Sequence, residues 1–260
     1  MEDLRVTIVQ SPLHWEDIKA NIAMFGKTLS AIAPGSTDLI VLPEMFSTGF
    51  SMNAKAIAED MNGEAVNWMR KTAAEKKCVL TGSLMIKDGN NFYNRLVWMK
   101  SDGSYETYDK KHLFRMGEEN NTYTKGTKKI VVELKGWKIC PLVCYDLRFP
   151  VWSRNVNQAY DCLIYVANWP EVRSYPWRQL LIARAIENQC YIVAVNRVGK
   201  DGHNMNHDGY SAVIDSKGHY VKETTPNEPT LETVTLSWKA LEDFRKAFPV
   251  GLDADPFELK

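Results

Sequence analysis

The sequence has no excess of charge of either sign. Its 260 residues include 32 Lys and Arg and 32 Asp and Glu, so the formal net charge is zero with neutral histidines. A protein that binds nucleic acid or an anionic membrane surface usually carries an excess or a patch of basic residues. We therefore expect a small molecule or a protein as the partner, and no nucleic acid.

Long hydrophobic runs are also missing. No apolar stretch approaches the roughly 20 residues that a membrane-spanning helix needs, so we expect no membrane segment. Residues 1–5 are acidic and lead into a short apolar run. They lack the basic flank and the long apolar centre of a secretory signal, and the cytoplasm is the expected compartment.

Cysteine is scarce, and its number is odd, with five in the chain. This favours free thiols in a reducing compartment over a disulfide framework. Cys140 and Cys144 have no second cysteine pair to complete a zinc site, and His203 and His207 have no third ligand in the sequence around them. We expect neither a metal nor another cofactor.

The sequence does contain an alternation of short apolar runs and amphipathic segments. Apolar residues fall at steps of three and four over 15–32, as on one face of a helix, whereas 39–42 and 162–167 are continuous apolar runs typical of buried strands. Neither a repeat nor a linker interrupts the alternation, so we predict one α/β domain over residues 1–260. Further helices are predicted at 64–77 and from about 176, and further strands at 4–10, 79–86, 94–100, 105–110, 137–144, 192–196, 211–215 and 231–238.

Two local features qualify this pattern. Pro141 lies inside the predicted strand 137–144 and removes one ladder donor, which indicates a bulge or a locally unpaired position. Residues 111–126 are polar, and we expect them to form a loop that covers the surface.

A thiol, Cys144, lies where the predicted strand 137–144 runs into a turn. Reacting groups of α/β proteins often lie at the carboxyl ends of strands, but a lone cysteine in a strand is more commonly an inert buried residue. A thiol with an ordinary pKa of roughly 8.5 also needs a base or a cation nearby. Glu44, which follows the strand 39–42, and Lys110 are candidates, although each taken alone is more often a solvated surface residue.

Three segments in order resemble the nitrilase, or carbon-nitrogen hydrolase, superfamily. They are Pro43-Glu44, Lys110-x-His112-Leu113-Phe114 and Cys144-Tyr145-Asp146-Leu147-Arg148-Phe149-Pro150, and the similarity continues through Asn168-Trp169-Pro170, 183–188 and Asn196-Arg197-Val198-Gly199. The resemblance implies an α/β fold of the α-β-β-α sandwich type, which forms four layers. It also implies hydrolysis of a non-peptide carbon–nitrogen bond through a thioester.

The resemblance assigns a role to each residue of this Glu-Lys-Cys triad. Cys144 is implied as the nucleophile and Glu44 as the general base. Lys110, together with the backbone N–H of Tyr145, is implied to stabilise the developing oxyanion. The superfamily often has a second glutamate after the lysine. Glu118 and Glu119 are both available, and counting back from Gly126 favours Glu119 without excluding Glu118.

The other charged residues of these motifs are expected to serve the fold. Arg184 and Glu187 lie at helical spacing and are predicted to form an ion pair. His112 is expected to be packed and hydrogen-bonded, and Asp146 and Arg148 to fix the turn after Cys144.

The segments around the triad look most like the omega-amidase branch of the superfamily, whose members remove ammonia from 2-oxoglutaramate or 2-oxosuccinamate. Such a substrate needs an apolar slot and a cation for its distal carboxylate. The alternatives are another amidase of the superfamily, acting on a carbamoyl or aliphatic amide, and a non-catalytic member that binds a ligand. The resemblance also suggests a homodimer or a higher homo-oligomer. Candidate cations are Arg173 and Arg115, and candidates for the slot are Phe46, Tyr145 and Trp169.

Overall fold

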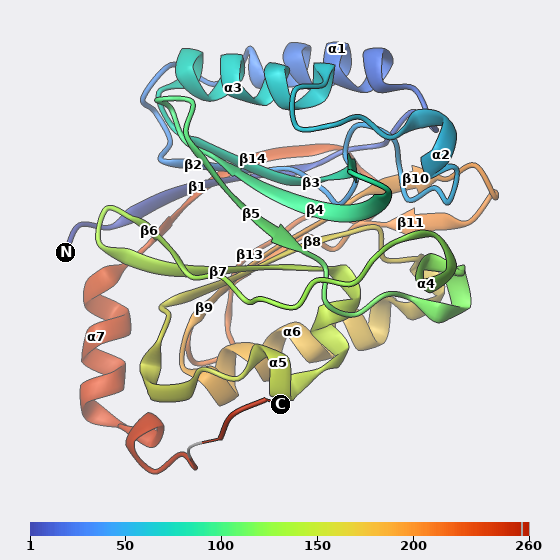
Figure 1. Cartoon of the computed structure of the whole chain (residues 1–260). Coiled ribbons are helices and arrows are strands. Elements are labelled where there is room, and N and C mark those ends of the chain that lie inside the picture. The colour runs from blue at the N-terminus through green and yellow to red at the C-terminus, as the bar shows by residue number, and fades with distance from the viewer. Residues whose placement is uncertain (256, 260) are drawn as a thin grey trace.

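The structure, a computed structural model that describes residues 1–255 and 257–259, contains two six-stranded sheets stacked face to face (Figure 1). Helices α1 (Ile18–Leu29) and α3 (Glu64–Lys76) cover the outer face of one sheet. Helices α5 (Pro150–Ser153) and α6 (Ser174–Asn188) lie on the outer face of the other. The predicted α-β-β-α sandwich is confirmed.

The first sheet has the strand order β14-β1-β2-β3-β4-β5. Strands β1, β2 and β3 are parallel to one another, and the other neighbours are antiparallel. The bounds are β1 (Leu4–Gln10), β2 (Leu39–Val41), β3 (Val79–Asp88), β4 (Asn91–Met99), β5 (Tyr105–Asp109) and β14 (Thr230–Leu236).

The second sheet has the order β13-β12-β9-β8-β7-β6, and β7, β8 and β9 are parallel. A separate antiparallel pair joins β10 (Val198–Lys200) to β11 (Asn206–Asp208). The bounds of the second sheet are β6 (Val132–Leu134), β7 (Trp137–Val143), β8 (Cys162–Ala167), β9 (Tyr191–Asn196), β12 (Ala212–Ile214) and β13 (Tyr220–Glu223).

The side-chain alternation of the strands divides the core in two. Leu39 and Val41 of β2 belong to the cluster between the two sheets, while Ile40 and Leu42 pack under α1 and α3. Strands buried on both faces read as continuous apolar runs, which is why the central strands could be recognised from the sequence. The carboxyl ends of β2 and β7, where Glu44 and Cys144 follow, are brought to the same edge of the sandwich.

Several predicted boundaries differ from the structure. The first helix begins at Ile18, because Asp17 caps it by accepting a hydrogen bond from the N–H of Ala20. The predicted loop 111–126 contains two short helical turns, η1 (Arg115–Gly117) and α4 (Glu119–Thr122). Pairing of β6 with β7 stops at Ile139, so Pro141 lies at a locally unpaired position, and its register with β8 shows no bulge.

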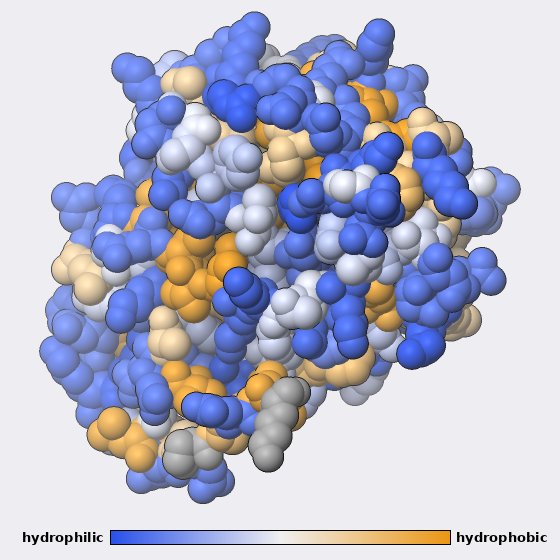
Figure 2. Space-filling model, in the orientation of Figure 1, coloured by the Kyte–Doolittle hydropathy of each residue, from blue (hydrophilic) through white to orange (hydrophobic). Residues whose placement is uncertain are grey.

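The remaining elements lie at the edges of the layers. They are α2 (Ala54–Ile57), α7 (Trp238–Ala247) and the 3₁₀ turns η2 (Cys144–Arg148), η3 (Val156–Gln158), η4 (Glu171–Arg173) and η5 (Val250–Leu252). In the part of the chain that the structure describes, no helix is both long and apolar enough to cross a membrane. Figure 2 shows a largely hydrophilic face with separate, small hydrophobic areas.

Candidate active site

Cys144 begins η2 directly after β7 and has a backbone φ of +42°, in the left-handed region that residues other than glycine seldom adopt. The buried carboxylate of Asp146 stabilises this turn. It accepts hydrogen bonds from the N–H of Val143 at 3.1 Å, the N–H of His112 at 3.0 Å and the hydroxyl of Tyr108 at 2.7 Å. The backbone conformation of Cys144 at the strand end is therefore held by neighbouring segments.

The structural roles expected for the flanking residues are largely confirmed. The ring of His112 lies 2.8 Å from Asp146 through Nδ1 and stacks on Phe149 at 3.8 Å between centroids. Arg184 and Glu187 form an ion pair at 3.0 Å. His112 thus connects the segment that carries Lys110 to the turn that carries Cys144.

Glu44, Lys110 and Glu119 form a buried ion cluster. The ammonium of Lys110 donates to Glu44 Oε1 at 2.9 Å and to Glu119 Oε2 at 2.9 Å, and all three side chains are at most 1% exposed. Glu118 lies in an exposed position instead. The structure therefore brings Glu119, and not Glu118, to the lysine.

Two asparagines complete the cluster. Asn94, in β4, donates from Nδ2 to Glu44 at 2.8 Å and to Glu119 at 3.1 Å. Asn168, just after β8, donates its backbone N–H to Glu44 Oε2 at 2.8 Å. Sequence reasoning missed the part that Asn94 plays in the cluster, because Asn94 is the first residue of the predicted strand 94–100, whereas it lies inside β4 (Asn91–Met99) in the structure.

The cluster controls the ionisation of the thiol. Burial and the nearby charge of Glu44 raise the pKa of Cys144 well above its ordinary value, against the opposing effect of Lys110. Cys144 is therefore protonated at rest, with a carboxylate positioned to accept the proton as a nucleophile forms.

The other two ionisable groups are shifted in the same direction. Burial raises the pKa of Glu119, helped by the charge of Glu44 and opposed by Lys110. Burial acts to lower the pKa of Lys110, but the charges of Glu119 and Glu44 more than compensate, so this pKa is raised. Lys110 is therefore a cation at neutral pH, held between two buried carboxylates.

A cavity of about 710 Å³ opens onto Cys144, Glu44 and Lys110. Of the residues predicted to bind the substrate, Tyr145, Trp169 and Arg173 line it. Most of its wall area is apolar, with aromatic rings, and its lining also includes charged and polar side chains, among them Glu118, Asp201, His203 and His207. This is the composition of a site for a small organic molecule. The other lining residues include Phe50, Met52, Phe114, Met116 and Asn168.

Two of the substrate-site predictions are wrong. Phe46 is fully buried in the core under α1 and α3, with ring centroids 5.6 Å from Phe25 and 5.7 Å from Trp68. Met45 has a φ of +43°, so the chain turns after Glu44 and directs the Phe46 ring away from the cavity. Arg115 is exposed on η1 and is not among the residues that line the cavity.

Comparisons with known proteins identify the family of the chain. A sequence profile of the carbon-nitrogen hydrolase family matches residues 5–246. The omega-amidase YafV of Escherichia coli (strain K12) is 44% identical over 261 residues, covering 100% of both chains. The chain belongs to the carbon-nitrogen hydrolase family. It is therefore a hydrolase that acts on carbon–nitrogen bonds, and the resemblance seen in the sequence motifs is confirmed.

A further sequence relative and a solved structure are similar to most or all of this carbon-nitrogen hydrolase. The 2-oxoglutaramate amidase of Bacillus subtilis (strain 168) is 35% identical over 217 residues, which cover 82% of this chain and 83% of that protein. The crystal structure of XC1258 from Xanthomonas campestris superposes with a TM-score of 0.98 at 44% identity, with complete coverage of both chains. That structure is of a CN-hydrolase superfamily protein with an arsenic adduct in the active site.

Arg148 has a position in this carbon-nitrogen hydrolase that the sequence did not predict. We expected it to fix the turn after Cys144, but its guanidinium lies 4.9 Å from the centre of the Trp169 ring and lines the cavity. Arg173 lies 5.4 Å from the centre of the Phe114 ring on the same cavity. Neither arginine forms an ion pair with any carboxylate of residues 1–255 or 257–259.

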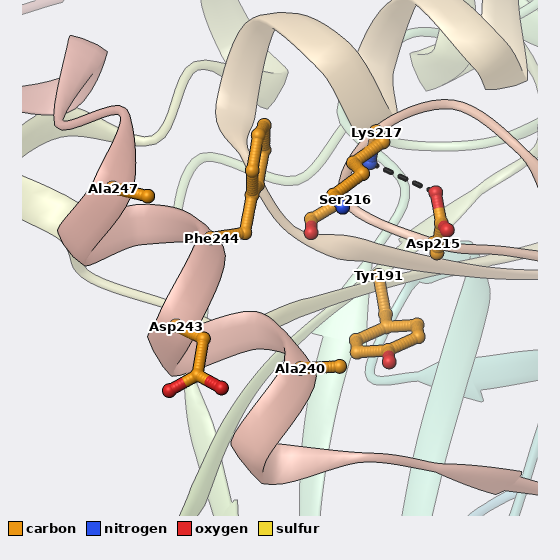
Figure 3. Close-up of a pocket in the computed structure, with 8 residues that line it drawn as sticks. All are labelled: Tyr191, Asp215, Ser216, Lys217, Ala240, Asp243, Phe244 and Ala247. Atoms are coloured by element: carbon orange, nitrogen blue, oxygen red, sulfur yellow. Dashed lines mark hydrogen bonds between the residues drawn. The ribbon is translucent and has the colours of Figure 1, made fainter.

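A second cavity, of about 380 Å³, lies between α7 and the turn that follows β12 (Figure 3). The backbone N–H of Lys217 donates to Asp215 at 2.9 Å there, and the ammonium of Lys217 lies 5.3 Å from the centre of the Phe244 ring. None of its lining residues is a cysteine or a histidine. Among the described residues, no group of three or more His, Cys, Asp or Glu side chains is arranged to hold a metal ion.

Proposed function

We propose that this carbon-nitrogen hydrolase is an omega-amidase, which releases ammonia from the terminal amide of a small 2-oxo dicarboxylic acid monoamide. The observation that carries the proposal is the combination, in one cavity, of Cys144 with two arginines that lack carboxylate partners among the described residues. The names of the relatives in Escherichia coli and Bacillus subtilis support the same substrate class.

The first half of the proposed reaction forms a thioester. Glu44 accepts the thiol proton as the Cys144 sulfur attacks the amide carbon. The ammonium of Lys110 and the backbone N–H of Tyr145 stabilise the resulting oxyanion, and each well-placed donor contributes about 3 to 4 kcal/mol in comparable acyl transfers. When the intermediate collapses, the carbon–nitrogen bond breaks, and Glu44 returns the proton to the departing ammonia.

The second half hydrolyses the thioester. Glu44 takes a proton from water, and the oxygen of that water adds to the thioester carbon. The carbon–sulfur bond then breaks, and Glu44 returns the proton to the Cys144 sulfur, which restores the resting thiol and releases the carboxylic acid. Glu119 holds the ammonium of Lys110 in place throughout, through two hydrogen bonds of 3.0 and 2.9 Å.

The substrate's distal carboxylate is proposed to bind Arg148, with Arg173 further along the same wall. Arg148 is half-buried, and its guanidinium is held against Trp169. An ion pair with a carboxylate is stronger at such a partly desolvated site than on an open surface. The aromatic rings of Tyr145 and Trp169 would contact the short carbon chain of the substrate.

Ammonia release tests the proposal directly. We expect wild-type enzyme to turn over 2-oxoglutaramate, and Cys144→Ala to show no turnover. Arg148→Gln should lower kcat/KM for 2-oxoglutaramate by roughly ten- to hundredfold, through the loss of one charged hydrogen bond, but leave a neutral aliphatic amide almost unaffected.

Each alternative has its own outcome in this experiment. Preference for a neutral or carbamoyl amide would assign the chain to another amidase activity of the family. Absence of turnover with every amide would favour a ligand-binding protein. Trapping of a covalent acyl adduct on Cys144, detected by mass spectrometry, would support the thioester.

We also propose that the chain acts as one domain in the cytoplasm and assembles as a homodimer or a higher homo-oligomer. The outer layer of the second sheet supports the assembly, since Val172 on η4 and Tyr175 on α6 are 79% and 77% exposed. Large exposed apolar side chains that lie close together are typical of protein interfaces. A monomer in light scattering would contradict this proposal.

A further inference from the structure

Asn94 lies at the centre of the buried charged cluster. Its side-chain amide bonds Glu44 and Glu119, which lie outside its own strand β4. Its backbone is fixed on both sides of β4, by pairing with Met85 of β3 and by accepting the N–H of Lys110 at 3.0 Å. Its side chain is 1% exposed. The Nδ2 group donates to the two carboxylates, whereas Oδ1 has no hydrogen-bond partner among the described residues. Leaving a buried amide oxygen unpaired costs free energy, so packing alone does not explain this residue.

The hydrogen bonds of Asn94 close a ring with those of Lys110. Both Nδ2 of Asn94 and Nζ of Lys110 donate to the same two oxygens, Glu44 Oε1 and Glu119 Oε1, at distances between 2.8 and 3.1 Å. One donor is a cation and the other is neutral. With both carboxylates ionised, the ring has a net negative charge. A second cation in place of Asn94 would remove that charge and weaken the base.

We propose that Asn94 is a positioning residue that holds Glu44 Oε1 and Glu119 Oε1 together beside Lys110, and so sets the lower pH limit at which Cys144 can be activated. The inference rests on the proposed function, because it assigns Glu44 as the base. Without the amide donor, Glu44 and Glu119 would share only Lys110, and repulsion between them would favour protonation of one carboxylate. The base would then be available only at higher pH. The other ionisable groups near Glu44 are Lys110, Glu119, Cys144 and Tyr123.

The test measures thiol reactivity, which needs no knowledge of the substrate. The rate of Cys144 alkylation by iodoacetamide is followed by mass spectrometry across a range of pH. All five cysteines are buried, but only Cys144 lines the cavity, so the other four should remain unmodified in the folded enzyme. In Asn94→Ala we expect the acidic limb of the alkylation profile to move up by about one pH unit, so that the rate falls about tenfold on that limb and stays near the wild-type rate at neutral pH. Asn94→Ser, which supplies a single hydroxyl donor, should show a smaller shift.

Asn155→Ala is the matched control. Asn155 is also a buried asparagine, but its side chain bonds only backbone groups, of Tyr160 and Asn188. This variant should melt at a lower temperature and retain the wild-type pH profile. An unchanged acidic limb in both Asn94 variants would overturn the inference, as would an equal shift in Asn155→Ala.

The same measurement separates the two proposals. A shifted limb in an enzyme that hydrolyses no amide would support the role of Asn94 and reject the omega-amidase assignment. Wild-type turnover of 2-oxoglutaramate, combined with an unshifted limb in the Asn94 variants, would support the omega-amidase assignment and reject the role of Asn94.

Discussion

Two buried charged clusters in this enzyme differ in their balance of charge. At the carboxyl ends of the strands, one cation, Lys110, is shared by two carboxylates that are both fully buried. Behind the second sheet, Arg245 pairs with a single carboxylate, Asp161, and its remaining N–H groups donate to the backbone oxygens of Gln189 and Tyr160. The second cluster is electrically and sterically satisfied. The first cluster has two carboxylates and one cation beside the thiol of Cys144. Unbalanced buried charge of this kind is more typical of an active site than of a structural ion pair.

Removal of the shared cation should have the largest effect. In Lys110→Met, two buried carboxylates lose their counter-ion, and the oxyanion loses a donor. We expect kcat/KM for amide hydrolysis to fall by about a thousandfold or more. Steady-state kinetics and circular dichroism together separate this loss from misfolding.

Lys111→Met is the neighbouring control. The ammonium of Lys111 lies 5.1 Å from the centre of the Trp152 ring, outside the carboxylate cluster, and the substitution should leave kcat/KM within about twofold of wild type. An equal loss of kcat/KM in Lys110→Met and Lys111→Met would show that catalysis depends on the overall charge of this segment and not on the cation shared by Glu44 and Glu119.

Substitution in the cluster of Arg245 and Asp161 should lower stability and leave catalysis unchanged. Arg245→Met leaves Asp161 buried without its partner and should lower the free energy of unfolding by about 3 kcal/mol, while kcat per folded molecule stays unchanged. Urea denaturation measures the first quantity, and activity in the absence of denaturant the second.

Lys246→Met, on the same helix, provides the comparison for an exposed pair. Its partner is Glu242, and the two side chains are 70% and 45% exposed. We expect this substitution to change stability by about 0.5 kcal/mol or less. A loss of activity in Arg245→Met without a loss of stability would contradict the division between the two clusters.

The sequence predicted the backbone positions of the site better than its side-chain directions. Glu44 and Cys144 were recognisable because each follows a continuous apolar strand, and parallel strands end at the same edge of a sandwich. Phe46 was misplaced because the positive φ of Met45 reverses the chain after Glu44. No pattern in the sequence around Met45 predicts that change of chain direction.

Arg148 and Asn94 illustrate the same limit. The direction of Arg148 depends on how η2 leaves β7, and its contact with Trp169 joins two distant segments. Asn94 meets Glu44 across 50 residues and Glu119 across 25. Contacts of this kind depend on strand register and loop path, which a single sequence does not specify.

A third region combines a buried histidine with a buried arginine, and its effect should be smaller than the effects of replacing Lys110 or Arg245. His207, on β11, is 2% exposed and lies near Arg197, which is 1% exposed. Burial and the charge of Arg197 lower the pKa of His207 to about 4. The unfolded chain, with a histidine pKa of roughly 6.5, therefore binds a proton that the folded chain refuses, so stability falls as the pH drops from about 6.5 towards 4.

Wild-type enzyme should thus lose about 1 to 2 kcal/mol of stability between pH 7 and pH 5 from this group alone, and His207→Gln should remove that part of the loss. Thermal melting at the two pH values measures it, with His14→Gln at an exposed position as the control. A pH dependence that is the same in wild type and His207→Gln would mean that His207 is protonated in the folded chain. In that case, burial beside the cation of Arg197 would not be sufficient to keep His207 neutral. By the same reasoning, charge and burial alone would not explain how Glu44 is held beside Lys110, and the hydrogen bonds from Asn94 and Asn168 would be needed as well.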